Sequence, residues 1–259
     1  MQRAILYTCD NFANMKAARE HLKLSSKTIY KRHYAQLEIR WREKKNDVWP
    51  TTIGIDEHSF IRNKKHGHRE FVTMVVDYNN KRLKEVLPTR TVGELEQQLS
   101  YIRGRENVKN VCMDLSSSYR SFAKNYFPNA RIIADKFHVV RLPMQSLQKY
   151  LKQVKTETKE HKLRRKLLLK NSFKLERETR TMIYEWLELH PTIKEIYLAK
   201  ETLNKAYRCE NAGHARRILT KLTDALAFTN VPELKSLRRT LINWMDEILN
   251  YFENKLTNA

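Results

Sequence analysis

The order of apolar and polar positions divides this chain into a β-rich part followed by a longer helical part. Runs rich in β-branched and aromatic residues, typical of strands, occupy residues 51–58, 69–78, 81–88, 107–115 and 130–135. Asn79-Asn80 predicts a hairpin turn, because asparagine tolerates positive φ. Helical spacing begins at Thr91 and ends at Gly104, and recurs over 116–127. We therefore expect an α/β fold with a mixed sheet: an antiparallel three-strand meander plus two strands added in parallel after helices.

Helical spacing continues from about residue 138, with no convincing strand. Pro191 and Pro232 are expected to separate successive helices. Apolar stripes that predict buried helix faces fall at Leu167–Leu169 and at Trp244, Ile248, Leu249 and Phe252. We assign residues 143–259 to a large all-helical C-terminal insertion.

Two short helices are predicted within residues 12–37. Asn14 is expected to cap a helix that runs to Leu22, and Ser25 or Ser26 to cap the next one. The second helix would turn Ile29 inward and place outward the residues Lys27, Tyr30, Lys31, Arg32 and His33. This arrangement is typical of a DNA-binding helix-turn-helix, although an ordinary basic helical hairpin has the same pattern.

The assigned helix-turn-helix segment is 1–37, and the charged stretch 38–50, which ends in Pro50, is interpreted as a linker or helix tail. The α/β core is expected at 51–142. A chain of 259 residues is long enough for a proper hydrophobic core.

Charge narrows the class of partner. Fifty Lys and Arg residues face 29 Asp and Glu residues, which leaves a net charge of +21. Such a surplus repels itself unless a polyanion or a solvated surface absorbs it, so nucleic acid is the favoured partner. The three cysteines are far apart in sequence, without zinc or disulfide spacing, and no apolar run is long enough to span a membrane. A reducing cytoplasm is the expected location.

Two acids stand where strand-like runs end: Asp56 in IGIDEH and Asp114 in VCMDLSSSY. At the ends of neighbouring strands their carboxylates would lie close enough to share metal ions. Mg²⁺, or Mn²⁺ in its place, prefers oxygen ligands, and two ions about 4 Å apart suit phosphoryl transfer. Solvated strand ends are the alternative. Asp77 also ends a strand, but it precedes the Asn-Asn turn and is predicted to be a turn residue.

A further acid and a histidine follow at Asp135-Lys-Phe-His138, where the fifth strand gives way to a helix. Taken alone, they would be a helix cap and an ordinary histidine. Beside Asp56 and Asp114 they are candidates to orient the metal-binding acids or to contact phosphate.

The segments IGIDEH, VTMVVDYNNKRLKEVLP, VCMDLSSSYRSF, PNARIIADKFHVVRL and NYFENKLTNA resemble the DDE transposases of bacterial insertion sequences, in particular the ISL-three family. The resemblance covers residues 12–259 and is strongest over 51–142. It implies a ribonuclease-H-like core with a helical insertion, and magnesium-dependent cutting and joining of double-stranded DNA at an element's terminal repeats and at target DNA. By motif match, Asp56 and Asp114 are the first and second catalytic acids and metal ligands. Asp135 and His138 match an acid-x-x-His pattern, and the N-terminal segment matches the family's helix-turn-helix. The resemblance also implies a homo-oligomer on DNA and a location in the bacterial cytoplasm, associated with the nucleoid.

Two departures from the family pattern shape the expectation. Members usually begin with a cysteine-rich zinc-binding segment, which is not found here. Their third acid is a Glu shortly after a Thr-Asn-Gly/Ala pattern, which corresponds to Thr257-Asn258-Ala259, so this Glu is expected just beyond the sequence. Glu247 and Glu253 match no catalytic position. The expectation is thus a transposase whose site is incomplete in this chain and which binds DNA but cleaves it poorly.

Two alternatives remain open from the sequence. One is a non-catalytic transposase remnant that occupies element ends or inhibits a full-length partner. The other is a ribonuclease-H-like nuclease that acts on RNA–DNA hybrids, although the helix-turn-helix and the helical insertion favour DNA ends.

Overall fold

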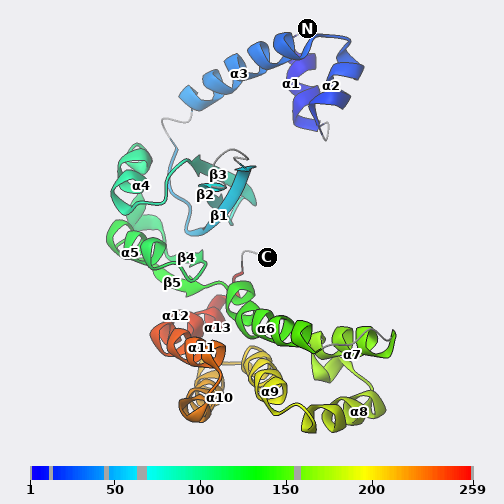
Figure 1. Ribbon diagram of the computed structural model, residues 1–259. Helices are drawn as coiled ribbons and strands as arrows, with labels where there is room; N and C mark the ends of the chain where they lie inside the picture. Colours follow the sequence, from blue (N-terminus) through cyan, green and yellow to red (C-terminus); the bar gives the residue numbers. More distant parts are fainter. Residues whose placement is uncertain (1, 12–13, 44–46, 63–68, 155–158, 258–259) are drawn as a thin grey trace. The chain divides into compact units, whose positions relative to one another are not determined.

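The chain divides into two compact units. Figure 1 shows its helices and strands, coloured along the sequence from the N-terminus to the C-terminus. The computed structural model describes residues 2–11, 14–43, 47–62, 69–154 and 159–257. One unit comprises residues 1–49 together with 99–105, and the other comprises 50–98 together with 106–259. Each unit is described by itself below.

The first unit contains three helices, α1 (Gln2–Asn11), α2 (Met15–Leu22) and α3 (Ser26–Glu43), which pack against one another. The predicted caps are confirmed: the Asn14 side chain accepts a hydrogen bond from the Ala17 amide at 3.0 Å, and the Ser25 hydroxyl accepts one from the Thr28 amide at 3.2 Å. Helix α1 was not predicted. It buries Ile5 in the core of this small unit.

Helix α3 buries Ile29 and exposes Lys27, Tyr30, Lys31 and Arg32, as expected. His33 is a correction, because it is half-buried instead of outward. It lines a groove of about 270 Å³ with residues of α1 and α2. The helix also continues to Glu43, so residues 38–43 belong to α3.

The second unit is built on a mixed sheet, which confirms the predicted α/β fold. Its strands are β1 (Thr52–Arg62), β2 (Arg69–Asp77), β3 (Arg82–Leu87), β4 (Asn110–Met113) and β5 (Arg131–Ala134). Among the described residues they lie in the order β3-β2-β1-β4-β5. The pairs β1–β2 and β2–β3 are antiparallel, whereas β1–β4 and β4–β5 are parallel. The meander therefore carries the two later strands on its β1 edge.

The helices that separate the later strands follow the apolar pattern. Helix α5 (Ser117–Tyr126) packs against β4 and β5 and buries Phe122. Helix α4 (Val92–Leu99) begins after Thr91, as predicted, but ends before Gly104. The chain leaves the helix in a turn, in which the Ile102 amide donates to the Leu99 carbonyl at 3.1 Å. Ile102 is still buried, so the apolar spacing was satisfied without a helix.

The β2–β3 hairpin depends on Asp77, which is the turn residue that the sequence predicted. Its carboxylate accepts hydrogen bonds from the backbone amide of Asn80 at 3.0 Å and from the Asn80 side chain at 2.7 Å, and it lies 3.4 Å from Arg82. Positive φ is found at Lys81 (52°) and not at either asparagine, which corrects the expected turn conformation. The buried carboxylate thus holds the turn through the residues that follow it.

Replacing Asp77 with asparagine is expected to destabilise the protein by about 1 kcal/mol at pH 7. Burial alone would raise the pKa of Asp77, but its bonds to Asn80 and the charge of Arg82 lower it below 3.8. A lowered folded-state pKa stabilises the fold above the unfolded value, and this contribution is lost as pH falls through the folded value. Urea unfolding should therefore show a difference between the two proteins at pH 7 that shrinks below about pH 4. An equal difference at both pH values would contradict this role.

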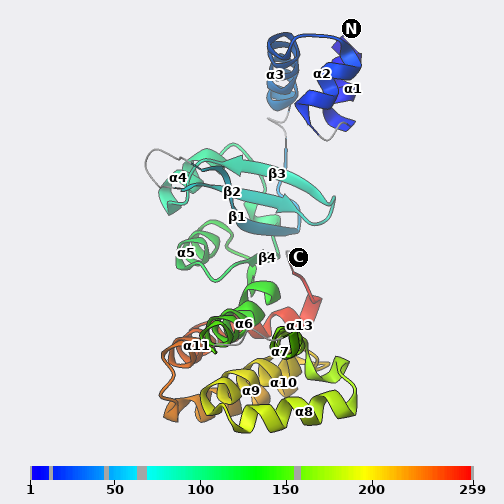
Figure 2. The ribbon, with the colours of Figure 1, turned by 45° about the vertical axis from the view of Figure 1, so that its right-hand side comes forward.

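The remaining elements form the helical region that was expected (Figure 2). They are α6 (Lys136–Gln153), α7 (Lys159–Leu169), η3 (Ser172–Lys174), α8 (Arg177–Glu188), α9 (Pro191–Ala206), α10 (Ala212–Ala225), η4 (Leu226–Phe228), α11 (Pro232–Asn243), α12 (Met245–Leu249) and α13 (Tyr251–Asn254). Pro191 and Pro232 occupy the first position of α9 and α11, where proline is tolerated. Within 136–154 and 159–257 no strand is found. Nor does the described part of the chain contain a helix with the length and apolar character needed to cross a membrane.

Candidate active site

Three acids lie side by side at the carboxyl ends of the parallel pairings of β1, β4 and β5. The β1–β4 ladder ends with the pair Ile55 and Met113, and the β4–β5 ladder ends with Met113 and Ala134. Asp56, Asp114 and Asp135 are the next residues of their strands. The ladder geometry continues one step further, because the Asp135 amide donates to the Met113 carbonyl at 2.7 Å. The sheet therefore delivers three carboxyl groups to one edge.

Asp56 does not end its strand, which corrects the sequence interpretation. Strand β1 continues to Arg62 and pairs with β2 beyond the acid, with Asp56 opposite Met74. It is the parallel ladder that ends at Asp56, because β4 is short and stops at Met113. Asp56 is consequently paired with β2 on one side, while on the other side it lies beyond the last pair of the parallel ladder, next to Asp114.

Asp114 is half-buried, and the pKa of its carboxyl group is shifted by its surroundings. Burial raises the pKa of its carboxyl group; His138 and a hydrogen bond from the Ser116 amide at 3.0 Å lower it, and the charges of Asp56 and Glu57 raise it. The net pKa is raised. Neighbouring negative charge and loss of water both disfavour the carboxylate, and a bound cation would relieve both.

His138 lies between two of the acids. Its Nε2 atom is 3.9 Å from an Asp56 oxygen and 3.7 Å from an Asp135 oxygen. The imidazole is in the first turn of α6, which places it at the same sheet edge as Asp114. A protonated His138 would bridge Asp56 and Asp135, so the structure brings together all four residues that the sequence selected for this site.

Asp135 differs from the other two acids because it is fully buried, with 1% of its surface exposed. Its side chain caps α6 by accepting a hydrogen bond from the Phe137 amide at 3.2 Å. The hydroxyl of Thr257 donates to the same oxygen at 2.5 Å. This carboxylate thus forms hydrogen bonds with the start of α6 and with the segment after α13.

Thr257 is a site residue that the sequence did not reveal. Before Thr257 the chain runs beside β4 and β5. The Asn250 side chain donates to the Ile132 backbone carbonyl at 2.8 Å, and the Asn254 side chain donates to the side-chain oxygen of Asn110 at 3.1 Å. No local pattern marks such a contact, because the two residues are joined only by the folding of the helical region. The Thr257-Asn258-Ala259 motif was the available signal.

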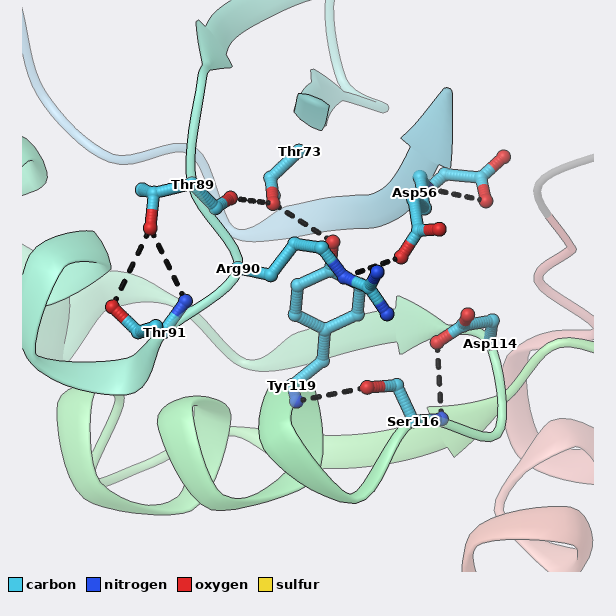
Figure 3. Close-up of polar contacts among 9 residues, drawn as sticks. Asp56, Thr73, Thr89, Arg90, Thr91, Asp114, Ser116 and Tyr119 are labelled. Carbon is cyan, nitrogen blue, oxygen red and sulfur yellow. Dashed lines mark hydrogen bonds and ion pairs between the residues drawn. The ribbon is translucent and has the colours of Figure 1, made fainter. Parts of the chain in front are cut away.

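The acids are backed by polar contacts, shown in Figure 3, that were also not predicted. Arg90 pairs with Glu57, the neighbour of Asp56, at 2.8 Å. The buried Tyr119 hydroxyl lies 2.8 Å from the Thr73 hydroxyl, which donates to the Thr89 carbonyl at 2.5 Å, so Tyr119 is the donor to Thr73. These bonds tie β2 and α5 to the loop before α4.

Glu247 and Glu253, which match no catalytic position of the family pattern, form ion pairs with basic residues of α5 and β5. Glu247 is buried and pairs with Arg120 of α5 at 2.5 Å, with Lys124 at 3.9 Å. Glu253 pairs with Arg131 at the start of β5.

The donor set of the site suits a hard divalent cation. In the described ranges no three or more His, Cys, Asp and Glu side chains are grouped so as to hold a metal ion. Asp56 and Asp114 offer two carboxylates side by side, with one of them desolvated. Mg²⁺ is commonly bound by one or two carboxylates together with water and substrate phosphate, so these residues fit it without a complete protein cage.

Comparisons with known proteins agree with the resemblance seen in the sequence. A sequence model of the ISL3-type DDE transposases, described as "Transposase", matches residues 53–259. The "Transposase for insertion sequence element IS1001" of Bordetella parapertussis is 22% identical over 249 residues. That match covers 92% of this chain and 59% of the relative's length. The family match includes all the acids described above and the helical region.

Proposed function

Because the chain belongs to the ISL3 family of DDE transposases, we propose that it catalyses metal-dependent DNA cleavage and strand transfer at the ends of an insertion sequence. The observation that carries the proposal is the row formed by Asp56 and Asp114 at the end of the parallel ladder. The family supplies the class of reaction, and this edge of the sheet supplies the carboxylates that such a reaction requires.

Asp56 and Asp114 would hold the divalent ions, Mg²⁺ or Mn²⁺, with two ions expected as in other phosphoryl-transfer sites. When bound, such ions supply positive charge that stabilises the phosphoryl group during transfer. The protein's own part is to fix the two carboxylates. Strand β1 is paired on both sides up to Asp56, and the Ser116 amide holds an oxygen of Asp114 at 3.0 Å.

Asp135 and His138 would position the reacting groups. Asp135 is fixed by the α6 cap and lies 3.7 Å from the His138 imidazole. That contact would orient His138 towards Asp56 or towards a DNA phosphate. The contact between Thr257 and Asp135 brings the start of the Thr-Asn-Gly/Ala pattern to the row of acids.

Double-stranded DNA would be recognised in part by α3. Its exposed residues Lys27, Lys31 and Arg32 fit phosphate contacts, and Tyr30 lies on the same solvent-exposed surface of the helix. Terminal repeats and target DNA are the proposed substrates, and synapsis of two ends would require a homo-oligomer.

The test is a cleavage assay on three labelled substrates with a protein that includes the third acid implied by the family: a duplex that carries the element's terminal repeat, a scrambled duplex and an RNA–DNA hybrid. Metal-dependent cleavage of the terminal-repeat duplex alone is the expected result. Binding without cleavage in Mg²⁺ and in Mn²⁺ would favour the non-catalytic remnant. Cleavage confined to the RNA strand of the hybrid would favour a ribonuclease H.

A further inference from the structure

Phe228 is the most exposed large apolar side chain among the described residues, with 90% of its surface accessible. It ends η4, the short 3-10 turn that joins α10 to α11. A fully exposed phenylalanine makes no packing contribution to its own fold, and isolated exposed apolar residues need no explanation unless their surroundings suggest a partner.

The backbone on either side of this ring is anchored in the fold. Leu226 and Val231, which flank it, are buried, and so is Thr229. The Thr229 hydroxyl accepts a hydrogen bond from the Val231 amide at 3.1 Å, and the Thr229 amide donates to the Leu226 carbonyl at 3.4 Å. The segment around Phe228 is therefore anchored, while the ring itself points away from the core.

A groove of about 330 Å³ lies next to the turn and contains only basic, polar and apolar side chains. It is lined by Leu226, Ala227, Lys235, Arg238, Arg239, Ile242 and Asn243. The last five recur at helical spacing along one face of α11, while Leu234, Leu237 and Leu241 bury the opposite face. The three cations of this face lie within about 6 Å of helix, so they could contact neighbouring phosphates of one strand.

We propose that Phe228 and the cationic face of α11 bind an unstacked nucleotide of DNA together with its flanking phosphates. The ring would stack on the base, as aromatic side chains do in proteins that bind single strands. Lys235 and Arg239 would contact phosphates, while Arg238 already donates to the Thr223 carbonyl at 2.9 Å and is held in place beside them. Charge complementarity identifies the occupant, because three cations line the groove and no acid does.

Arg120 links the groove to the helix that follows Asp114. Asn243, at the end of the groove, accepts a hydrogen bond through its carbonyl from Arg120 at 3.0 Å. Arg120 lies in the first turn of α5, the helix that begins just after Asp114, and its guanidinium also covers the Trp244 ring at 4.7 Å. A strand held in the groove would thus lie on the same folded unit as the proposed cleavage site. This inference extends the proposed function to the disposition of DNA near a cut end.

The experiment compares binding to a blunt duplex and to the same duplex with a short single-stranded tail, by fluorescence anisotropy in EDTA. Phe228→Ala should weaken binding to the tailed duplex by about 10- to 100-fold, and Phe228→Trp should preserve it. Binding to the blunt duplex should change little in either variant. Because no metal is present, these results are independent of whether the protein cleaves DNA.

Leu189→Ala is the matched control, since Leu189 is also highly exposed, at 77%, but lies beside Glu188 instead of a cationic groove. It should bind both duplexes normally. Photocrosslinking of 5-iodouracil in the tail should attach the DNA to Phe228. The inference would be overturned if Phe228→Ala bound the tailed duplex as well as the unchanged protein, if the crosslink mapped elsewhere, or if the substitution altered only self-association.

Discussion

Replacing Asp114 with asparagine is expected to reduce DNA cleavage and strand transfer by about a thousandfold or more, which corresponds to about 4 kcal/mol of transition-state stabilisation. Asparagine keeps the size of the side chain and its acceptor for the Ser116 amide, but it removes the negative charge. Asp56 and Asp114 directly follow the last pair of the parallel ladder, Ile55 and Met113, so one neutral member leaves a single carboxylate for the ion. Calorimetric titration with Mn²⁺ should show the corresponding loss of metal affinity.

The fold should tolerate this substitution. Burial and the neighbouring charges of Asp56 and Glu57 disfavour the Asp114 carboxylate, as its raised pKa indicates. The neutral variant should therefore unfold at the same temperature as the unchanged protein, or above it, at pH 7 without metal. Asp246→Asn is the matched control, because Asp246 is an exposed acid of α12 that pairs with Arg216 at 2.8 Å. Full activity in Asp114→Asn, or equal loss in Asp246→Asn, would contradict the assigned role.

Removing the three cations of α3 is expected to have the second large effect. The variant with Lys27, Lys31 and Arg32 replaced by alanine should bind terminal-repeat duplex about 100-fold more weakly or worse near physiological salt. The plot of log affinity against log salt has a negative slope, and each lost phosphate contact makes it shallower by about 0.9. The magnitude of the slope should therefore decrease by nearly three. Anisotropy titrations at several salt concentrations measure both quantities.

A variant of the same unit with equal charge loss serves as the control: Lys16, Arg19 and Arg105 replaced by alanine. These residues are exposed but lie outside α3. Their removal should change the affinity and the salt slope much less. Similar losses in the two variants would indicate diffuse attraction by the positive charge of the protein, and would remove the reason for assigning a helix-turn-helix.

The strands and the direction in which they pair could be predicted because each strand has a clear local sequence pattern, whereas their order in the sheet was not predicted. β-branched runs, the Asp77 turn and the intervening helices determine which strands are antiparallel and which are parallel, and that topology places Asp56 beside Asp114. The family resemblance pointed to the same two acids independently. The local sequence pattern and the topology point to the same acids because these acids come immediately after the last paired residues of the parallel ladders.

Features that depend on distant partners could not be read from the sequence. Strand β1 continues past Asp56 because β2 pairs with it, although EHSFIR alone has no clear strand pattern. Helix α6 keeps Pro143 in its interior, where a break would be expected from proline. Thr257 reaches Asp135 only through the path of α12 and α13 beside the sheet. In each case tertiary packing decides the outcome, and the local signal is weak or misleading.

Anomalous diffraction from crystals of the protein soaked in Mn²⁺ would locate the ion directly. We expect a peak about 2 Å from a carboxylate oxygen of Asp56 and of Asp114, and its disappearance in Asp114→Asn. A saturating soak that gave no peak between these two acids, or a peak at other residues that survived the substitution, would contradict their assignment as the metal ligands of a phosphoryl-transfer site.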